Sequence, residues 1–226
     1  MGRQKEIVFR IHGGARRGAG RKPKGERPLV AHAARAALSG REPVLVTMKV
    51  LRHVWNLRAR RAIERVLPAL AAATERGLSL AHYSVQRDHL HLIVETKDRR
   101  RLARTMQGLA VRIARALNRM MRRTGKVFAD RYHDRVLATP RQVRNALLYV
   151  LNNARKHGVL AAGLVFDPCS SAAAFDGWRH ADAERDRLTR EHAPPVLAPR
   201  TWLLAIGWQR AGGPLDPRHR PGPLPA

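Results

Sequence analysis

The segment 86–95 reads Gln-Arg-Asp-His-Leu-His-Leu-Ile-Val-Glu, and it constrains the fold more than any other part of the chain. Apolar residues at 90, 92 and 94 alternate with His89, His91, Ile93 and Glu95, which is the period of a β-strand with one face in a hydrophobic core. His89 and His91 then lie side by side on the other face. Two adjacent imidazoles indicate a divalent metal site, because neutral imidazole is a common ligand. A pair of half-exposed strand histidines without a ligand explains these ten residues equally well.

The charge of the chain indicates a polyanionic partner. Its 226 residues include 44 lysines and arginines against 17 acidic residues, which gives a formal net charge of +27. Such an excess adds self-repulsion to the folded state and has no use in an enzyme of small neutral metabolites. The basic residues are spread along the whole chain and do not form one amphipathic helix. We therefore expect nucleic acid, and not a membrane surface, as the partner.

Cysteine content and hydropathy favour an intracellular protein. Cys169 is the only cysteine, so an intramolecular disulfide and a cysteine-rich zinc site are both excluded. No apolar run approaches the length of a membrane span, and the first residues lack the apolar core of a signal peptide. We expect a cytoplasmic protein with one domain of moderate size and additional tails.

Hydrophobic periodicity predicts the element order β-α-β-β-α-β, followed by one further helix. The predicted strands cover residues 43–50, 78–86, 89–95 and 135–138, and the predicted helices cover 59–75, 99–122 and 140–156. We expect Pro68 to kink or break the first helix. The short connection at 87–88 makes a hairpin of the second and third strands. This order is that of an α+β fold with a ferredoxin-like antiparallel sheet, with two helices on one face and the other face open.

Composition divides the chain into three parts. Residues 1–41 are rich in glycine, proline and basic residues, and we expect them to form a flexible basic arm. Four residues of this arm are predicted phosphate contacts: Arg16, Arg17, Arg21 and Lys22. The folded domain is expected at 42–180. Residues 181–226 are predicted to form a proline-rich C-terminal extension, mostly extended and partly disordered, that docks through the tryptophans and leucines of 202–208.

The helix predicted at 140–156 carries a polar pair away from its apolar stripe. At about 100° per residue, the stripe consists of Val143, Leu147, Val150, Leu151 and Ala154. Tyr149 falls well away from the centre of this stripe, and Asn153 is its neighbour one turn later. The pair is a candidate functional site. A half-buried tyrosine beside a solvated asparagine is also an ordinary feature of helices.

Three segments together resemble the single-tyrosine HUH transposases, and most of all the REP-associated tyrosine transposases within the IS200-like family. They are the His-Leu-His strand at 89–91, the segment Thr-Gly-Lys-Val-Phe-Ala-Asp-Arg-Tyr at 124–132, and the stretch Tyr-Val-Leu-Asn-Asn-Ala-Arg-Lys-His-Gly at 149–158. Their order and spacing are compatible with the family, and the resemblance covers residues 43–180. The chain departs from the family at Ala154, where proline is frequent, and at Asp88, where asparagine or glutamate is more frequent.

The resemblance implies an enzyme, a DNA strand transferase that cuts and rejoins single-stranded or hairpin DNA. It implies that Tyr149 is the nucleophile and forms a 5′-phosphotyrosine, leaving a free 3′-OH. It also implies that His89, His91 and Asn153 bind a divalent metal ion, which we expect to be Mg²⁺ or Mn²⁺. Basic residues in and after the helix 99–122 are predicted to hold DNA phosphates, namely Arg112, Arg115, Arg119 and Arg131.

Two other functions are compatible with the sequence. A replication initiator or relaxase uses the same chemistry, but such proteins usually have a lysine three residues after the tyrosine or a tyrosine pair, and Asn152 stands at that position. A non-catalytic or domesticated nucleic-acid-binding protein could keep the same fold and charge. The resemblance further implies a bacterial, nucleoid-associated protein that acts in DNA transposition and recombination as a monomer or homodimer.

Overall fold

The computed structural model describes residues 37–180, 183–191 and 193–222 of the chain. The predicted phosphate contacts Arg16, Arg17, Arg21 and Lys22 lie outside the described residues, together with most of the predicted arm. Among the helices that are described, none combines the length and the hydropathy that a membrane crossing requires.

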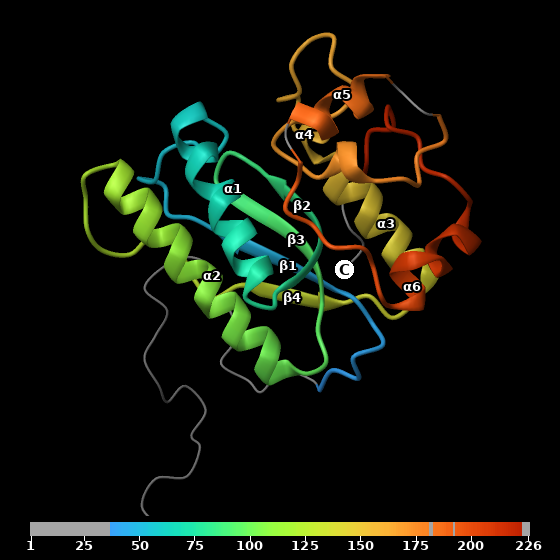
Figure 1. Ribbon diagram of the computed structural model, residues 1–226, viewed down its shortest axis with the longest axis horizontal. Coiled ribbons are helices and arrows are strands. Elements are labelled where there is room, and N and C mark those ends of the chain that lie inside the picture. The colour runs from blue at the N-terminus through green and yellow to red at the C-terminus, as the bar shows by residue number, and fades with distance from the viewer. Residues whose placement is uncertain (1–36, 181–182, 192, 223–226) are drawn as a thin grey trace, which may run out of the picture. The chain divides into compact units, whose positions relative to one another are not determined.

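A four-stranded antiparallel sheet forms the centre of the described domain (Figure 1). Its strands are β1 (Val44–Lys49), β2 (Ser79–Val85), β3 (His89–Glu95) and β4 (His133–Val136), in the spatial order β2-β3-β1-β4. This order and these directions confirm the predicted ferredoxin-like sheet. β4 lies two residues nearer the N-terminus than predicted. Its pairing with β1 ends at Val136, and Thr139 already caps the following helix.

Two helices, α1 (Arg60–Glu75) and α2 (Arg99–Met120), cover one face of the sheet and pack on each other (Figure 1). α2 buries one residue per turn: Leu102, Met106, Leu109, Ile113 and Leu117. α1 continues through Pro68, so the predicted break does not occur. Pro68 and Glu64, whose carbonyl loses its helical partner, are both exposed, and water can hydrate that carbonyl.

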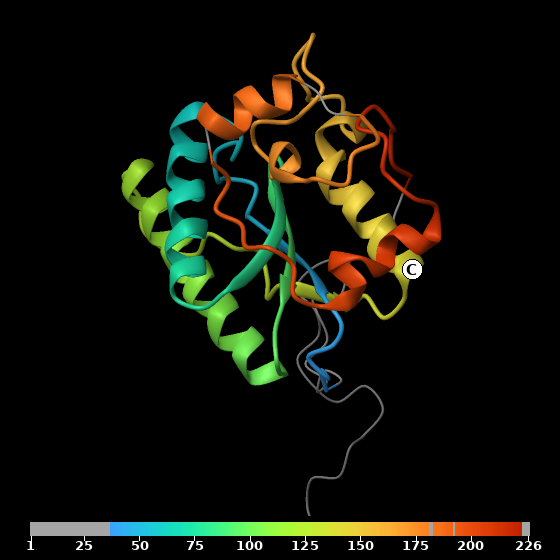
Figure 2. The same cartoon turned by 45° about the vertical axis from the view of Figure 1, so that its right-hand side comes forward.

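The second face of the sheet is covered as well, which corrects the expectation of an open face. Figure 2 shows the sheet between the α1–α2 layer and a second layer that contains α3 (Pro140–Leu151). Leu45 and Ile93 of the sheet pack in a second core with α3 and with residues from 166 to 215. The prediction failed because this cover comes largely from the last third of the chain, where no regular pattern is visible in the sequence.

The chain after α3 forms short elements. They are α4 (Asn153–Lys156), η1 (Ala172–Ala174), α5 (Ala183–Glu191), α6 (Trp202–Ala205) and η2 (Gly207–Ala211). The helix predicted at 140–156 is therefore divided at Asn152. The side-chain amide of Asn152 donates to the carbonyls of Asp216 and His219, at 3.1 and 2.9 Å. These long-range contacts hold the end of α3 against the C-terminal segment.

Aromatic side chains dock the C-terminal segment onto the second core. Trp208 is 2 % exposed, and its ring lies 5.5 Å from that of Phe175. Gly177 permits this packing, since a Cβ atom there would come within 2.5 Å of both rings. Trp202, in contrast, is 48 % exposed. Of the two tryptophans expected to dock, Trp208 makes the buried contact.

We expect Trp208→Ala to lower the free energy of unfolding by about 3–5 kcal/mol, because it removes a large buried side chain and leaves a cavity. Trp202→Ala is the matched control and should cost less than about 1 kcal/mol, since Trp202 is half exposed. Urea unfolding followed by circular dichroism measures both values. Equal losses in the two variants would contradict this description of the second core.

Candidate active site

Polar side chains gather at one end of the sheet face that α3 covers. His89 and His91 both point to this face, because they are two residues apart on β3. Their ring centroids are 4.6 Å apart. Thr47 of β1 and Ser84 of β2 stand directly opposite His91 in the two neighbouring strands. The predicted histidine pair therefore lies on a central strand, flanked by hydroxyl groups.

Each of the two histidines has one ring nitrogen engaged by a neighbour. Nδ1 of His91 lies 2.9 Å from the Thr47 hydroxyl, and Nδ1 of His89 lies 2.8 Å from Oδ1 of Asp88. A carboxylate only accepts hydrogen bonds, so Nδ1 of a neutral His89 carries the proton and Nε2 keeps its lone pair. Asp88 is thus turned toward Nδ1 and away from the free nitrogen.

Burial keeps the second histidine neutral. His91 is 5 % exposed, and burial lowers its pKa to about 3, with a smaller contribution from the basic groups around it. Its Nε2 atom is buried and has no hydrogen-bond partner among the described residues. An unpartnered buried nitrogen costs about 1–3 kcal/mol, so the arrangement favours a ligand at this atom.

α3 brings the predicted tyrosine onto His91, and the predicted asparagine begins α4 next to this tyrosine. The ring centroids of Tyr149 and His91 are 5.0 Å apart. Asn153 is fully buried, and neither atom of its amide has a hydrogen-bond partner in the part of the chain that the structure describes. Burial raises the pKa of the Tyr149 phenol, and the neighbouring Asn153 amide offsets part of this rise. The site thus places a phenol beside an amide and an imidazole nitrogen that have no hydrogen-bond partners among the described residues.

Two further basic residues belong to this site and were not predicted. Nζ of Lys156 lies 4.4 Å from the centroid of the Tyr149 ring, and the ring of His157 lies 5.9 Å from that of His89. Burial lowers the pKa of both groups. Lys156 follows Tyr149 by seven residues, or two helical turns, and this spacing was a usable signal. Nothing in the sequence indicates Thr47, because its contact depends on the pairing of β1 with β3.

The predicted phosphate contacts outside the arm lie apart from this site. Arg112, Arg115 and Arg119 line a groove of about 340 Å³ between α1 and α2, on the opposite side of the sheet from Tyr149. Arg131 is exposed in the loop before β4 and lines another hollow, of about 440 Å³, beside α2. The structure therefore does not bring these four arginines to the tyrosine.

We expect the imidazole of His91 to stay neutral from about pH 8 down to about pH 5 in protein stripped of metal with a chelator. The unfolded chain protonates this ring near its ordinary pKa of 6.5, so its burial should make the protein less stable as the pH falls from 6.5 towards 3. Long-range ¹H–¹⁵N spectra recorded across a pH series measure the titration, and His91→Asn assigns the signal. A midpoint near 6.5 would refute the buried, neutral ring.

Comparisons with known proteins relate the chain to a transposase family and to two solved structures. The family model described as "Transposase IS200 like" matches residues 43–150. A solved structure of a REP-associated tyrosine transposase bound to a REP hairpin aligns with 76 % of this chain and 93 % of its own, at a TM-score of 0.54 and 14 % identity, so the two share a fold. A bacterial tRNA(His) guanylyltransferase-like protein in complex with ATP aligns with 76 % of each chain, at a TM-score of 0.43 and 10 % identity. No curated protein matches the chain. The matched residues contain all four strands, α1, α2 and the tyrosine of α3, and this part of the chain is similar to the IS200-like transposases.

Proposed function

We propose that the protein is a metal-dependent DNA transposase that cuts and rejoins single-stranded or hairpin DNA through a 5′-phosphotyrosine at Tyr149. One observation carries the proposal: the Tyr149 ring lies 5.0 Å from His91, beside a buried imidazole nitrogen and a buried amide that have no partners among the described residues. The match of residues 43–150 to the IS200-like transposase family supports a transposase. The REP hairpin bound by the structural neighbour supports a hairpin substrate. Such an enzyme would act on the nucleoid in the bacterial cytoplasm, as a monomer or a homodimer.

Tyr149 supplies the nucleophile in this proposal. Its phenolic oxygen forms a bond to the scissile phosphorus, the bond from phosphorus to the 3′ oxygen breaks, and that oxygen takes up a proton as the 3′-OH. A phenol has an ordinary pKa of about 10 and leaves more easily than an aliphatic alcohol, so a 3′-OH can later reverse the step and join a new strand. The ammonium of Lys156 over the Tyr149 ring stabilises the phenolate form.

His89, His91 and Asn153 would hold the metal ion. Among the described residues, no three His, Cys, Asp or Glu side chains lie together in a way that could bind a metal, so the third protein ligand would be the amide of Asn153. Two imidazoles and an amide suit Mg²⁺ or Mn²⁺, and the nitrogen ligands favour Mn²⁺. A divalent ion held there would offset the charge of the scissile phosphate and fix its position.

The nucleophile is tested with labelled hairpin DNA from beside the protein's own gene, incubated with the protein and Mn²⁺ or Mg²⁺. We expect a covalent protein–DNA adduct that disappears in Tyr149→Phe and in the presence of a chelator, because both the phenol and the ion are required. Tyr132→Phe is the matched control and should still form the adduct. Denaturing gel electrophoresis with and without protease measures it.

Two outcomes would contradict the proposal. An adduct that persists in Tyr149→Phe would show that another residue is the nucleophile. Tight, salt-sensitive DNA binding without an adduct, on varied hairpins and with either metal, would favour a non-catalytic nucleic-acid-binding protein on the same fold.

The role of Thr47 in orienting His91 is tested with Thr47→Val. This variant keeps the shape of the side chain and removes the hydrogen bond to Nδ1 of His91. We expect the affinity for Mn²⁺ to fall by about 10- to 100-fold, because an outer hydrogen bond orients a ligating imidazole. Thr105→Val is the control, since the Thr105 hydroxyl binds only carbonyls of its own helix. Calorimetric titration measures the affinities. The same Mn²⁺ affinity in the Thr47 variant and the wild type would show that this hydroxyl does not contribute to metal binding.

A further inference from the structure

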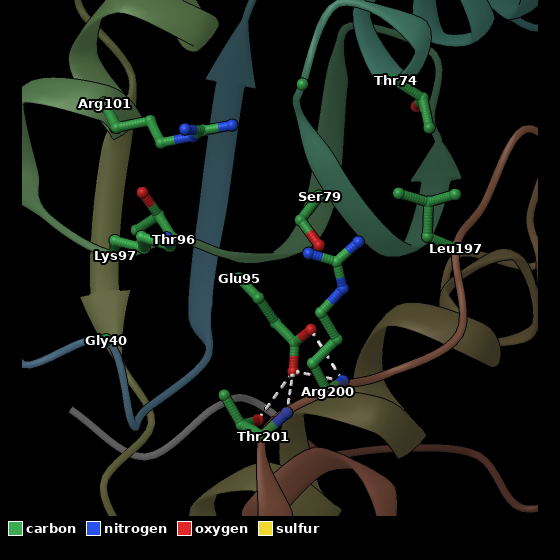
Figure 3. A pocket seen from close by; sticks show the side chains of 11 residues that line it. Gly40, Thr74, Ser79, Glu95, Thr96, Lys97, Arg101, Leu197, Arg200 and Thr201 are labelled. Atoms are coloured by element: carbon green, nitrogen blue, oxygen red, sulfur yellow. Dashed lines mark hydrogen bonds between the residues drawn. The ribbon is translucent and has the colours of Figure 1, made fainter.

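A second polar cavity lies at the other end of β3. It has a volume of about 350 Å³ and is lined by residues of α1, β2, α2 and the segment 197–201, together with Glu95, the last residue of β3 (Figure 3). Six residue steps of about 3.3 Å separate Glu95 from His89 along the strand, so the two ends lie about 20 Å apart. This cavity, which we call the Arg101–Arg200 pocket, is therefore separate from the tyrosine site.

Glu95 anchors the C-terminal segment at this pocket. Its carboxylate accepts hydrogen bonds from the backbone nitrogens of Arg200 and Thr201 and from the Thr201 hydroxyl, at 2.7 to 3.1 Å. Glu95 is 7 % exposed, and these donors occupy both of its oxygens. Figure 3 shows the Arg200 side chain extending away from the carboxylate that holds its backbone. The three donors thus satisfy the carboxylate oxygens, and the Arg200 guanidinium is not used to hold them.

The remaining polar groups of the pocket are those that bind a phosphate. Lys97, Arg101 and Arg200 provide three cations, and Ser79 provides a hydroxyl group. The hydroxyls of Thr74 and Thr96 donate to backbone carbonyls. No aromatic side chain is among the described lining residues, so a stacked base is not the expected occupant. The three cations and the Ser79 hydroxyl instead match the oxygens of a phosphate group.

Gly77 leaves space in the pocket for the side chain of Arg101. The residue ends α1 with a φ of +95°, which favours glycine. A Cβ atom at this position would come within 3.0 Å of the Arg101 guanidinium. Glycine thus meets the backbone requirement of the turn and also leaves room for the arginine beside it.

We propose that the Arg101–Arg200 pocket binds a backbone phosphate of the DNA substrate and fixes the distance between this phosphate and the one that Tyr149 attacks. The inference rests on the proposed function for its substrate. At about 3.4 Å per stacked nucleotide, the 20 Å between the two ends of β3 correspond to about six nucleotides. The pocket therefore sets the number of nucleotides between the phosphate that it binds and the phosphate that is cleaved.

The experiment compares Arg101→Gln/Arg200→Gln with Arg187→Gln/Arg190→Gln, which removes the same two charges from the exposed face of α5. Arg200→Gln keeps the backbone nitrogen that Glu95 binds, so the anchor of the C-terminal segment stays in place. All proteins also carry Tyr149→Phe, which separates binding from cleavage. The DNA probes are hairpins with single-stranded flanks of about 2 or about 10 nucleotides on either side, shorter and longer than the expected six.

We expect the pocket variant to bind the long-flank hairpin about ten-fold more weakly than the control, with a slope of log K against log salt smaller by about one per lost phosphate contact. With the short flank, both variants should bind equally, because that DNA does not reach the pocket. Fluorescence anisotropy at several salt concentrations measures the affinities, and thermal unfolding checks that the variants are folded. Adduct formation in proteins that keep Tyr149 then tests the proposed function independently.

Three results would overturn the inference. Equal weakening in both double variants would assign the effect to net charge alone. Equal weakening with short and long flanks would place the contact elsewhere. Binding of inorganic phosphate or a mononucleotide that requires Arg101 and Arg200, with unchanged DNA affinity in the variant, would identify a free phosphate compound as the occupant.

Discussion

The alternation along β3 is the constraint on which the rest of the structure depends. Leu90, Leu92 and Val94 are fully buried against the α1–α2 layer, and this burial fixes the register of a strand that is paired on both edges. A slip by one residue would exchange the two faces and place His89 and His91 in the apolar core. The hydrophobic effect on one side of the sheet thus positions the imidazoles on the other side.

The unpartnered polar atoms of the tyrosine site lower the stability of the folded protein. Nε2 of His91 and both atoms of the Asn153 amide are buried without partners among the described residues, and each such group costs about 1–3 kcal/mol. The hydrogen bonds of His91 with Thr47 and of His89 with Asp88 hold the two rings in their orientations. A bound ion and phosphate would recover this energy, which is the usual behaviour of a site organised before its ligand arrives.

The parts that depend on local periodicity could be predicted from the sequence, and the parts that depend on distant segments could not. The buried residues of α2 and the neighbourhood of Tyr149 and Asn153 follow from spacings of three or four residues. The contact of Thr47 with His91 requires the register of two strands 44 residues apart. The division of α3 from α4 requires the carbonyls of Asp216 and His219, and the cover of the second face requires Trp208 and its neighbours.

The contacts made by the last part of the chain affect the order in which the protein folds during synthesis. Strands and helices up to α3 are complete by residue 151, yet Leu204, Trp208 and Leu215 are needed to close the second core. A chain emerging from the ribosome therefore forms its sheet and its α1–α2 layer first. The sheet face that carries the imidazoles is not fully covered until almost the whole polypeptide has been made. The tyrosine site is therefore complete only at the end of synthesis, and a prematurely terminated chain would expose the apolar surface of the second core.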